Sequence, residues 1–138
     1  MRYLGLDLGS RTLGVAVSDK TGLIASNLET IRHNEEYDDL LVKIKELVES
    51  LEIDAVVLGF PKNMNNTIGP KGELSLEFKS KLEGILTIPI YLQDERLSTK
   101  SATDMLIQGN VSRKNRKKVV DSVAATIILQ TYLDGRDK

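Results

Sequence analysis

The sequence predicts an α/β fold built on a mixed five-stranded sheet with helices on its faces. Three strand-like segments come first, Tyr3–Leu8, Thr12–Ser18 and Leu23–Ile31, and the short turns between them favour antiparallel neighbours. After residue 35, helical and strand periods alternate, which is typical of strands that join a sheet in parallel. The 138 residues suit a single domain over 1–138.

The elements of the second part follow from changes in hydrophobic spacing. Leu40, Ile44 and Leu47 recur at helical intervals, whereas 55–59 and 88–92 are short apolar runs typical of strands covered on both faces. The elements expected after residue 35 are a helix over about 36–52, a strand at 55–59, a long exposed loop from Pro61 to Gly72, a helix bearing Leu74 to Leu86, a strand at 88–92, a helix bearing Ala102, Met105 and Leu106, and a last helix over about 116–133.

Composition narrows the class of protein. The absence of cysteine excludes a disulfide scaffold, a thiolate metal site and a cysteine nucleophile. The single histidine, His33, argues against a Ser-His-Asp mechanism, and we expect it at a strand end or in a loop rather than as a ligand. The first residues are too polar for a signal peptide and no apolar run reaches membrane length. We therefore expect a cytoplasmic protein without a membrane segment.

Asp7 stands out because it lies inside an apolar strand. Side chains alternate along a strand, so Asp7 shares its face with Gly5 and Gly9, away from the neighbouring leucines. Two flanking glycines leave a surface that another backbone can approach closely. The alternative is a side chain that caps the turn at Gly9-Ser10. We favour a functional role, because an unpaired buried carboxylate costs several kcal/mol and usually marks a partner or a metal.

Asp94 and Glu95 come directly after the predicted strand at 88–92. The C-terminal ends of parallel strands are where α/β sheets commonly place ligand chemistry. Adjacent residues in an extended chain point in opposite directions, so at most one of these two acids faces Asp7. A surface ion pair with Arg96 explains either acid equally well. Spacing alone leaves the choice open.

Asp121 lies on the apolar face of the last predicted helix. Positions 121, 124, 125, 128 and 132 share one face and read Asp, Ala, Ala, Ile, Tyr. The alanines allow the helix to lie close to the sheet, with the acid near the strand ends. The alternative is an acid that the helix dipole favours near the helix start, and such an acid would point outward.

Three converging carboxylates repel one another unless cations lie between them. Oxygen ligands without cysteine or a second histidine favour Mg²⁺ or Mn²⁺ over zinc. Two such ions about 4 Å apart can activate a water and stabilise the leaving oxygen during attack on phosphorus. The expected cofactor is therefore a pair of Mg²⁺ or Mn²⁺ ions.

Four segments of the chain together form a specific pattern: GLDLGSRTLGVAVSD at 5–19, VLGFPKNM at 57–64, DERLST at 94–99 and KVVDSVAA at 118–125. They resemble the YqgF family, whose members are described as Holliday-junction-resolvase-like proteins or as proposed nucleases for the precursor of 16S ribosomal RNA. The segments occur in family order and run nearly from end to end. The resemblance implies a ribonuclease-H-like fold and catalytic, metal-binding acids at Asp7, Glu95 and Asp121, which selects Glu95 over Asp94.

Basic residues suggest a surface for phosphates. The net charge is only −1, but RKNRKK at 113–118 holds five of the 19 lysines and arginines and leads into the helix that carries Asp121. The alternative is an ordinary solvated face. Aromatic residues make up only 4% of the chain, which favours recognition of shape and backbone over base stacking. The predicted nucleic-acid contacts are Arg11, Lys62, Arg96, Arg113, Lys114, Arg116, Lys117 and Lys118.

Three functions compete. The leading hypothesis is a metal-dependent endonuclease for structured RNA or branched DNA, with maturation of the 5′ end of precursor 16S ribosomal RNA as the family-based suggestion. A Holliday-junction resolvase would need a symmetric homodimer, and a non-catalytic ribosome-assembly module would bind RNA without cleaving it. The segment from Asp7 to Gly14 also resembles the phosphate loop of actin, Hsp70 and sugar kinases. Those proteins close a cleft between two such domains, and 138 residues supply one.

Overall fold

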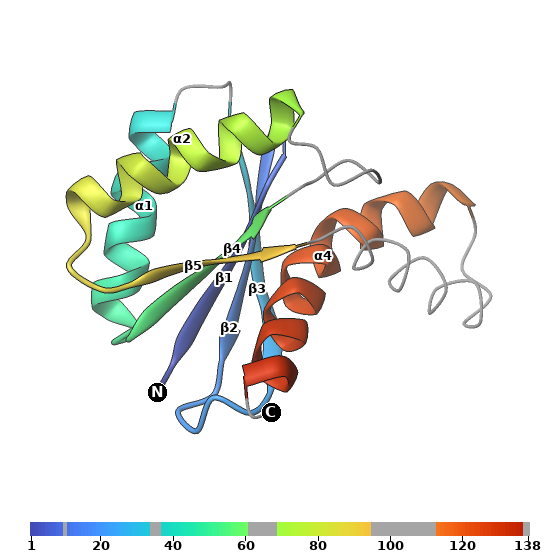
Figure 1. Cartoon of the computed structure of the whole chain (residues 1–138). Coiled ribbons are helices and arrows are strands. Elements are labelled where there is room, and N and C mark those ends of the chain that lie inside the picture. Colours follow the sequence, from blue (N-terminus) through green and yellow to red (C-terminus); the bar gives the residue numbers. More distant parts are fainter. Residues whose placement is uncertain (10, 34–36, 61–68, 95–112, 137–138) are drawn as a thin grey trace.

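The computed structural model describes residues 1–9, 11–33, 37–60, 69–94 and 113–136, without the side chains of residues 71, 113–123 and 136. Figure 1 shows its elements in chain order. They are the strands β1 (Tyr3–Leu8), β2 (Thr12–Ser18) and β3 (Ala25–Arg32), the helix α1 (Tyr37–Ser50), the strand β4 (Ala55–Phe60), the helix α2 (Pro70–Ile85), the strand β5 (Ile90–Asp94) and the helix α4 (Arg113–Arg136).

The strands form one five-stranded sheet in the order β3-β2-β1-β4-β5. The β1–β2 and β2–β3 pairs are antiparallel, and β4 and β5 are added in parallel beside β1. The predicted mixed sheet is therefore confirmed, including the change from antiparallel to parallel pairing. In this order the C-terminal ends of β1, β4 and β5 lie together at one edge of the sheet.

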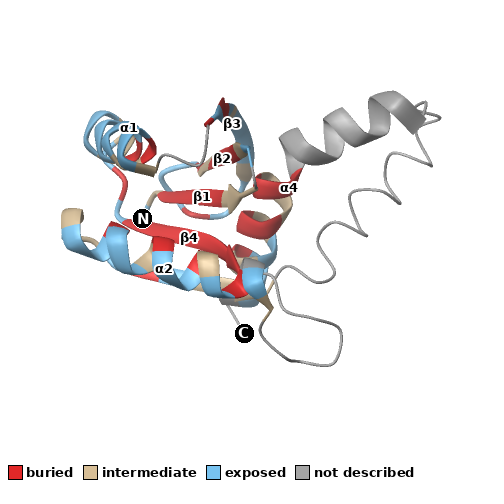
Figure 2. Ribbon diagram, turned by 90° about the horizontal axis from the view of Figure 1, so that it is seen from above, coloured by how far each residue is buried: buried red, intermediate tan, exposed pale blue. Residues whose placement is uncertain are grey.

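The helices divide between the two faces of the sheet (Figure 1). On one face, α1 and α2 bury Leu4, Leu6 and Leu58 together with Ile44 and Phe78. On the other face α4 covers a separate core, whose members are Tyr3, Ala16, Ala55, Val57, Ala125, Ile128, Leu129 and Leu133. Figure 2 shows the central strands β1 and β4 almost wholly buried between these layers. No helix in the described part of the chain is both long and apolar enough to cross a bilayer.

Two strand boundaries differ from the prediction. The third strand was expected from Leu23 but begins at Ala25, because the Asp19 carboxylate accepts hydrogen bonds from the amides of Leu23 (2.9 Å) and Ile24 (3.2 Å) and holds both in the turn. The fifth strand was expected over 88–92 and lies at Ile90–Asp94. Apolar runs therefore indicate that a strand is present more reliably than where it begins.

Two helix boundaries also differ. The helix α2 begins at Pro70, inside the predicted loop, with the proline at its first turn where the missing amide costs nothing. The helix α4 begins at Arg113 instead of about residue 116, so the basic run lies inside the helix. The predicted helix bearing Ala102, Met105 and Leu106 lies outside the described residues.

Candidate functional site

Asp7 is the next-to-last residue of β1 and lies on the α4 side of the sheet. Alternation along β1 sends Leu4 and Leu6 into the core under α1 and α2, whereas Tyr3 belongs to the core under α4. Asp7 has the same parity as Tyr3 and Gly5, and it is half-buried. The predicted face is therefore confirmed. The carboxylate stands where β1 ends and α4 crosses.

Glycines surround Asp7 in the plane of the sheet. Gly5 and Gly9 are its neighbours along β1, and Gly14 is its partner on β2. On the other side, β1 and β4 pair Leu6 with Leu58, and continuing that register by one residue sets Asp7 beside Gly59. None of these glycines has a side chain, and Gly5, Gly14 and Gly59 are buried, whereas Gly9 at the end of β1 is half-buried. A ligand can therefore approach the carboxylate most closely from the Gly9 end of the strand.

The helix α4 lies unusually close to β1. A Cβ atom added to Gly5 would lie 2.8 Å from Leu129 Cβ and 3.2 Å from the Ala125 carbonyl oxygen. Only glycine permits this approach. The close contact fixes the height of α4 above the strand that carries Asp7.

Asp121 continues the line of this contact. Tyr132 meets Tyr3 with 5.8 Å between ring centroids, and Leu129 meets Gly5, so α4 runs against the direction of β1. Asp121 lies four residues before Ala125, about 6 Å along the axis. Asp7 lies two residues beyond Gly5, about 6.6 Å along the strand. Asp7 along β1 and Asp121 along α4 therefore lie at similar distances beyond the contact between Gly5 and Ala125.

The helix-start alternative for Asp121 is wrong. Because α4 begins at Arg113, Asp121 lies more than two turns inside the helix, where the dipole of the first turn no longer acts. The rest of the predicted apolar face is confirmed, since Ala124, Ala125 and Ile128 are buried.

On β5, strand alternation separates Asp94 from the α4 face. Leu92 packs into the core on the α1 and α2 side, and Asp94 has the same parity. Tyr91 instead stacks on Tyr132 of α4, and Gln93 follows it on that face, paired with Gly59 of β4. Glu95 itself lies outside the described residues. Asp94 therefore does not share the face of Asp7, which argues against Asp94 as its partner.

Comparison with known proteins identifies the family. The sequence model of a family described as "RuvX: Holliday junction resolvase" matches residues 1–135. The chain belongs to the RuvX family. The predicted resemblance is confirmed, and the match runs through all four of the segments that carried it.

Relatives of this RuvX-family chain match over nearly their whole length. A protein of Geobacillus sp. (strain WCH70) is 52% identical over 137 residues, covering 99% of each chain. A protein of Bacillus subtilis (strain 168) is 54% identical over 136 residues, covering 98% of this chain and 99% of the relative. Both carry the name "Putative pre-16S rRNA nuclease".

Solved structures share the ribonuclease-H-like fold of this RuvX-family chain. Thermus thermophilus RuvC, in complex with a Holliday junction substrate, aligns with a TM-score of 0.61 at 17% identity, covering 99% of this chain and 96% of that one. The Fowlpox virus resolvase, in complex with Holliday junction DNA, aligns with a TM-score of 0.58 at 13% identity and covers both chains completely. The predicted fold class is confirmed.

The predicted phosphate contacts of this RuvX-family protein fall in three places. Arg11 is exposed in the turn after β1, close in sequence to Asp7. Lys62 and Arg96 lie outside the described residues. The remaining five belong to the first two turns of α4, and their side chains are not among those described: Arg113, Lys114, Arg116, Lys117 and Lys118.

His33 has a role that sequence spacing did not reveal. It follows β3, as predicted for a strand-end residue, and its ring Nε2 lies 3.0 Å from the Gly9 carbonyl oxygen. A carbonyl can only accept, so Nε2 carries the proton in this bond. The His33 amide also donates to the Arg11 carbonyl (2.9 Å). His33 therefore braces the turn that follows Asp7, and no local pattern signals a contact 24 residues away.

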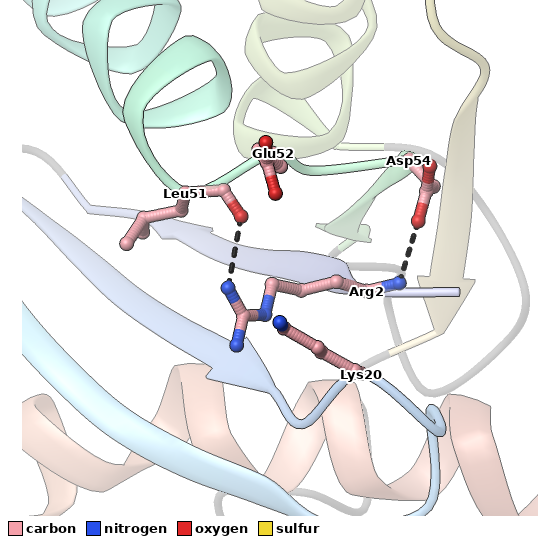
Figure 3. A pocket seen from close by; sticks show the side chains of 5 residues that line it. All are labelled: Arg2, Lys20, Leu51, Glu52 and Asp54. Carbon is pink, nitrogen blue, oxygen red and sulfur yellow. Dashed lines mark hydrogen bonds between the residues drawn. The ribbon is translucent and has the colours of Figure 1, made fainter.

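A pocket of about 270 Å³ lies at the opposite end of β1 (Figure 3). Arg2 Nη1 donates to the Leu51 carbonyl (3.0 Å), and the Arg2 amide donates to the Asp54 carboxylate (2.8 Å). A cation that satisfies the last carbonyls of α1 is a stabilising cap. The hydrogen bonds of Arg2 therefore hold the end of α1 against the start of β1, and the pocket is separate from the candidate site.

The described residues alone contain no group of three histidine, aspartate or glutamate side chains that could hold a metal ion. Of the three predicted acids, only the side chain of Asp7 belongs to this described set.

Proposed function

We propose that this RuvX-family protein is a metal-dependent endonuclease that hydrolyses phosphodiester bonds in structured nucleic acid. Asp7, Glu95 and Asp121 are its metal-binding and catalytic acids in this proposal. The observation that carries it is the setting of Asp7, a half-buried carboxylate flanked by glycines at the end of β1, on the face that α4 covers. In the proposal this carboxylate holds metal ions that bind the scissile phosphate.

The residues at hand fit Mg²⁺ or Mn²⁺. Asp7 supplies hard oxygen ligands, and the steps along β1 and α4 support bringing Asp121 to the same place. The family resemblance supports Glu95 as the third ligand, since it follows directly after β5 in the sequence. When bound, a pair of divalent ions supplies activation of a water and stabilisation of the leaving oxygen.

The chain itself binds and orients the substrate. Half-buried Gly9 lets the scissile phosphate approach the carboxylates from the end of β1, and the close packing of α4 on Gly5 fixes the distance between the two elements that carry acids. Exposed Arg11, in the turn after β1, and the basic run at the start of α4 can neutralise flanking phosphates. His33 keeps the turn that carries Arg11 in place.

The proposed substrate is the precursor of 16S ribosomal RNA, cleaved during maturation of its 5′ end. This choice is supported by relatives more than 50% identical over nearly the full chain, whose name refers to that RNA. The second candidate is branched DNA, because the family description and the RuvC and Fowlpox complexes refer to Holliday junctions. Cleaving both strands of a junction would require a homodimer.

A cleavage assay tests the function. Fragments of precursor 16S RNA, a four-way DNA junction and a linear duplex are incubated with Mg²⁺ or Mn²⁺ and compared with the same reactions in EDTA. We expect cleavage of the RNA that Asp7→Asn, Glu95→Gln and Asp121→Asn each lower by about 10²- to 10³-fold or more, because each removes a charge that the reaction depends on. Asp19→Asn is the matched control, since Asp19 lies in the turn at the opposite end of β2.

The outcomes separate the hypotheses. Preferential cleavage of the junction would replace the RNA substrate by branched DNA. Salt-sensitive RNA binding without cleavage of any substrate would contradict the nuclease and favour a ribosome-assembly module. Full activity in two of the three acid variants would refute the assignment of the site.

A further inference from the structure

Tyrosines gather where the C-terminal half of α4 crosses β5. The rings of Tyr91 and Tyr132 are stacked, with centroids 5.6 Å apart and planes inclined by only 17°. Tyr3 meets Tyr132 as well, at 5.8 Å and 58°. Tyr3 is buried, whereas Tyr91 remains 41% exposed at the outer end of the group. Tyr91 and Tyr132 form a stack that opens to solvent at Tyr91, and Tyr3 packs against its inner side at a tilt.

Core packing accounts for the inner rings but not for the outer one. Tyr3 and Tyr132 belong to the core under α4 or pack against it. Tyr91 adds a large aromatic ring to an edge strand, on the side where a smaller polar residue would be better solvated. A partly exposed aromatic ring that a second ring holds in place is a surface on which a flat ligand can stack.

The stack shares its face of the sheet with Asp7. Tyr91 pairs with Val57 of β4, and Val57 pairs with Gly5 of β1, so Tyr91 is level with Gly5 two strands away. Two strand spacings across and two residues along the strand separate the Cα atoms of Tyr91 and Asp7 by about 12 Å. That is roughly three or four nucleotide steps at the rise of about 3.4 Å per nucleotide in a stacked strand. Because β5 is an edge strand, a nucleic-acid chain can reach Tyr91 from the side.

We propose that Tyr91, supported by Tyr132, stacks on an unpaired base of the substrate a few nucleotides from the scissile phosphate. The proposal rests on the nuclease function proposed above and adds a specificity element to it. Stacking on tyrosine accepts any base but requires that the base be unpaired and accessible. The site therefore selects substrates with a single-stranded flank next to the cleavage position and disfavours a continuous duplex.

Binding measurements with inactive protein isolate this contact. The Asp7→Asn variant is titrated against a fluorescein-labelled RNA hairpin that carries a single-stranded flank, and against a second set of hairpins with one abasic nucleotide at each flank position. The same titrations are repeated with Tyr91→Leu added, which keeps an apolar side chain but removes the ring. Tyr91→Phe keeps the ring, and Val42→Ala on α1, a 60% exposed residue on the opposite side of the sheet, is the surface control.

We expect Tyr91→Leu to weaken binding by about 5- to 150-fold, the range for loss of one base–aromatic stack. Tyr91→Phe and Val42→Ala should bind as Asp7→Asn alone does. The slope of log affinity against log salt should not change in Tyr91→Leu, because no phosphate contact is lost. One abasic position should weaken binding to the protein that keeps Tyr91 but not to Tyr91→Leu. Such non-additivity requires direct coupling and is not produced by a change in folding.

Specific results would overturn the proposal. If every abasic substitution weakens binding equally with Tyr91 present and in the Tyr91→Leu variant, the ring does not contact a base. A wild-type protein that cleaves RNA while Tyr91→Leu binds normally would refute the stack and leave the nuclease function intact. A wild-type protein that neither binds nor cleaves RNA or DNA would refute both.

Discussion

Because α4 packs so closely on Gly5, we predict that Gly5→Ala lowers the cleavage rate by a larger factor than its modest loss of stability would suggest. The new Cβ would lie 2.8 Å from Leu129 Cβ, whereas carbon atoms pack best at about 3.5–4.0 Å. The helix must therefore move away by about 0.7–1.2 Å. Overpacking of this kind costs about 1–3 kcal/mol of the free energy of unfolding. A misplacement of about 1 Å between reacting groups can lower a rate about 10²-fold.

Two assays check this prediction side by side. Urea unfolding followed by circular dichroism measures stability, and RNA cleavage in Mg²⁺ measures the rate under conditions where the variant is fully folded. Gly84→Ala is the matched control: Gly84 is exposed in α2 and an added Cβ would meet nothing within 4 Å. We expect this control to gain about 0.5–1 kcal/mol of stability and to keep full activity. A Gly5→Ala protein with wild-type stability and rate would refute the argument that close packing of α4 sets the site.

Two further predictions concern the turns at the other end of the sheet. The Asp19 carboxylate accepts hydrogen bonds from the Thr21 hydroxyl and from two turn amides, which lowers its pKa from 3.8 to about 2. The stabilising effect of the charged Asp19 carboxylate is therefore complete above about pH 4 and lost as the pH falls through 2. The difference in unfolding free energy between wild type and Asp19→Asn should shrink as the pH falls over that range. A difference that stays constant with pH would contradict the prediction. Glu52, two residues beyond the end of α1, lies in the left-handed region (φ 54°), and the Ile53 amide donates to the Val48 carbonyl (3.0 Å), an arrangement that favours glycine. Glu52→Gly should raise the urea midpoint by the equivalent of about 1 kcal/mol. Glu49→Gly, inside α1, is the control and should destabilise the protein. If both variants destabilised the protein equally, Glu52 would not be strained and the prediction would be wrong.

Hydrophobic spacing predicted the type and order of the described elements, because helical repeats and short apolar or β-branched runs differ clearly along the chain. It located their ends less well. The third strand begins at Ala25 because the Asp19 side chain holds the two preceding apolar residues in a turn. Nothing in the apolar pattern distinguishes Leu23 and Ile24 from strand residues. Side-chain hydrogen bonds of this kind compete with strand pairing and decide the boundary.

Some features of the candidate site could likewise be predicted from the sequence, and others could not. Alternation along β1 was enough to put Asp7 on its face, because that inference needs only neighbours in sequence. The register between strands was needed to find Gly59 beside Asp7 and to separate Asp94 from the α4 face. The stack of Tyr91 on Tyr132 could not be predicted either, because its rings come from elements far apart in the sequence and the aromatic content of the chain is low.

Binding of Mn²⁺ measured by electron paramagnetic resonance tests the central claim most directly, since it needs no knowledge of the substrate. Free Mn²⁺ is followed during titration of the wild type, of Asp7→Asn, Glu95→Gln and Asp121→Asn, and of Asp19→Asn as the control. We predict that each of the three acid variants binds Mn²⁺ at least about tenfold more weakly, and that the control binds as the wild type does. Wild-type Mn²⁺ affinity in Asp7→Asn would contradict the proposed site, because the carboxylate at the centre of the glycine-lined surface would then hold no metal.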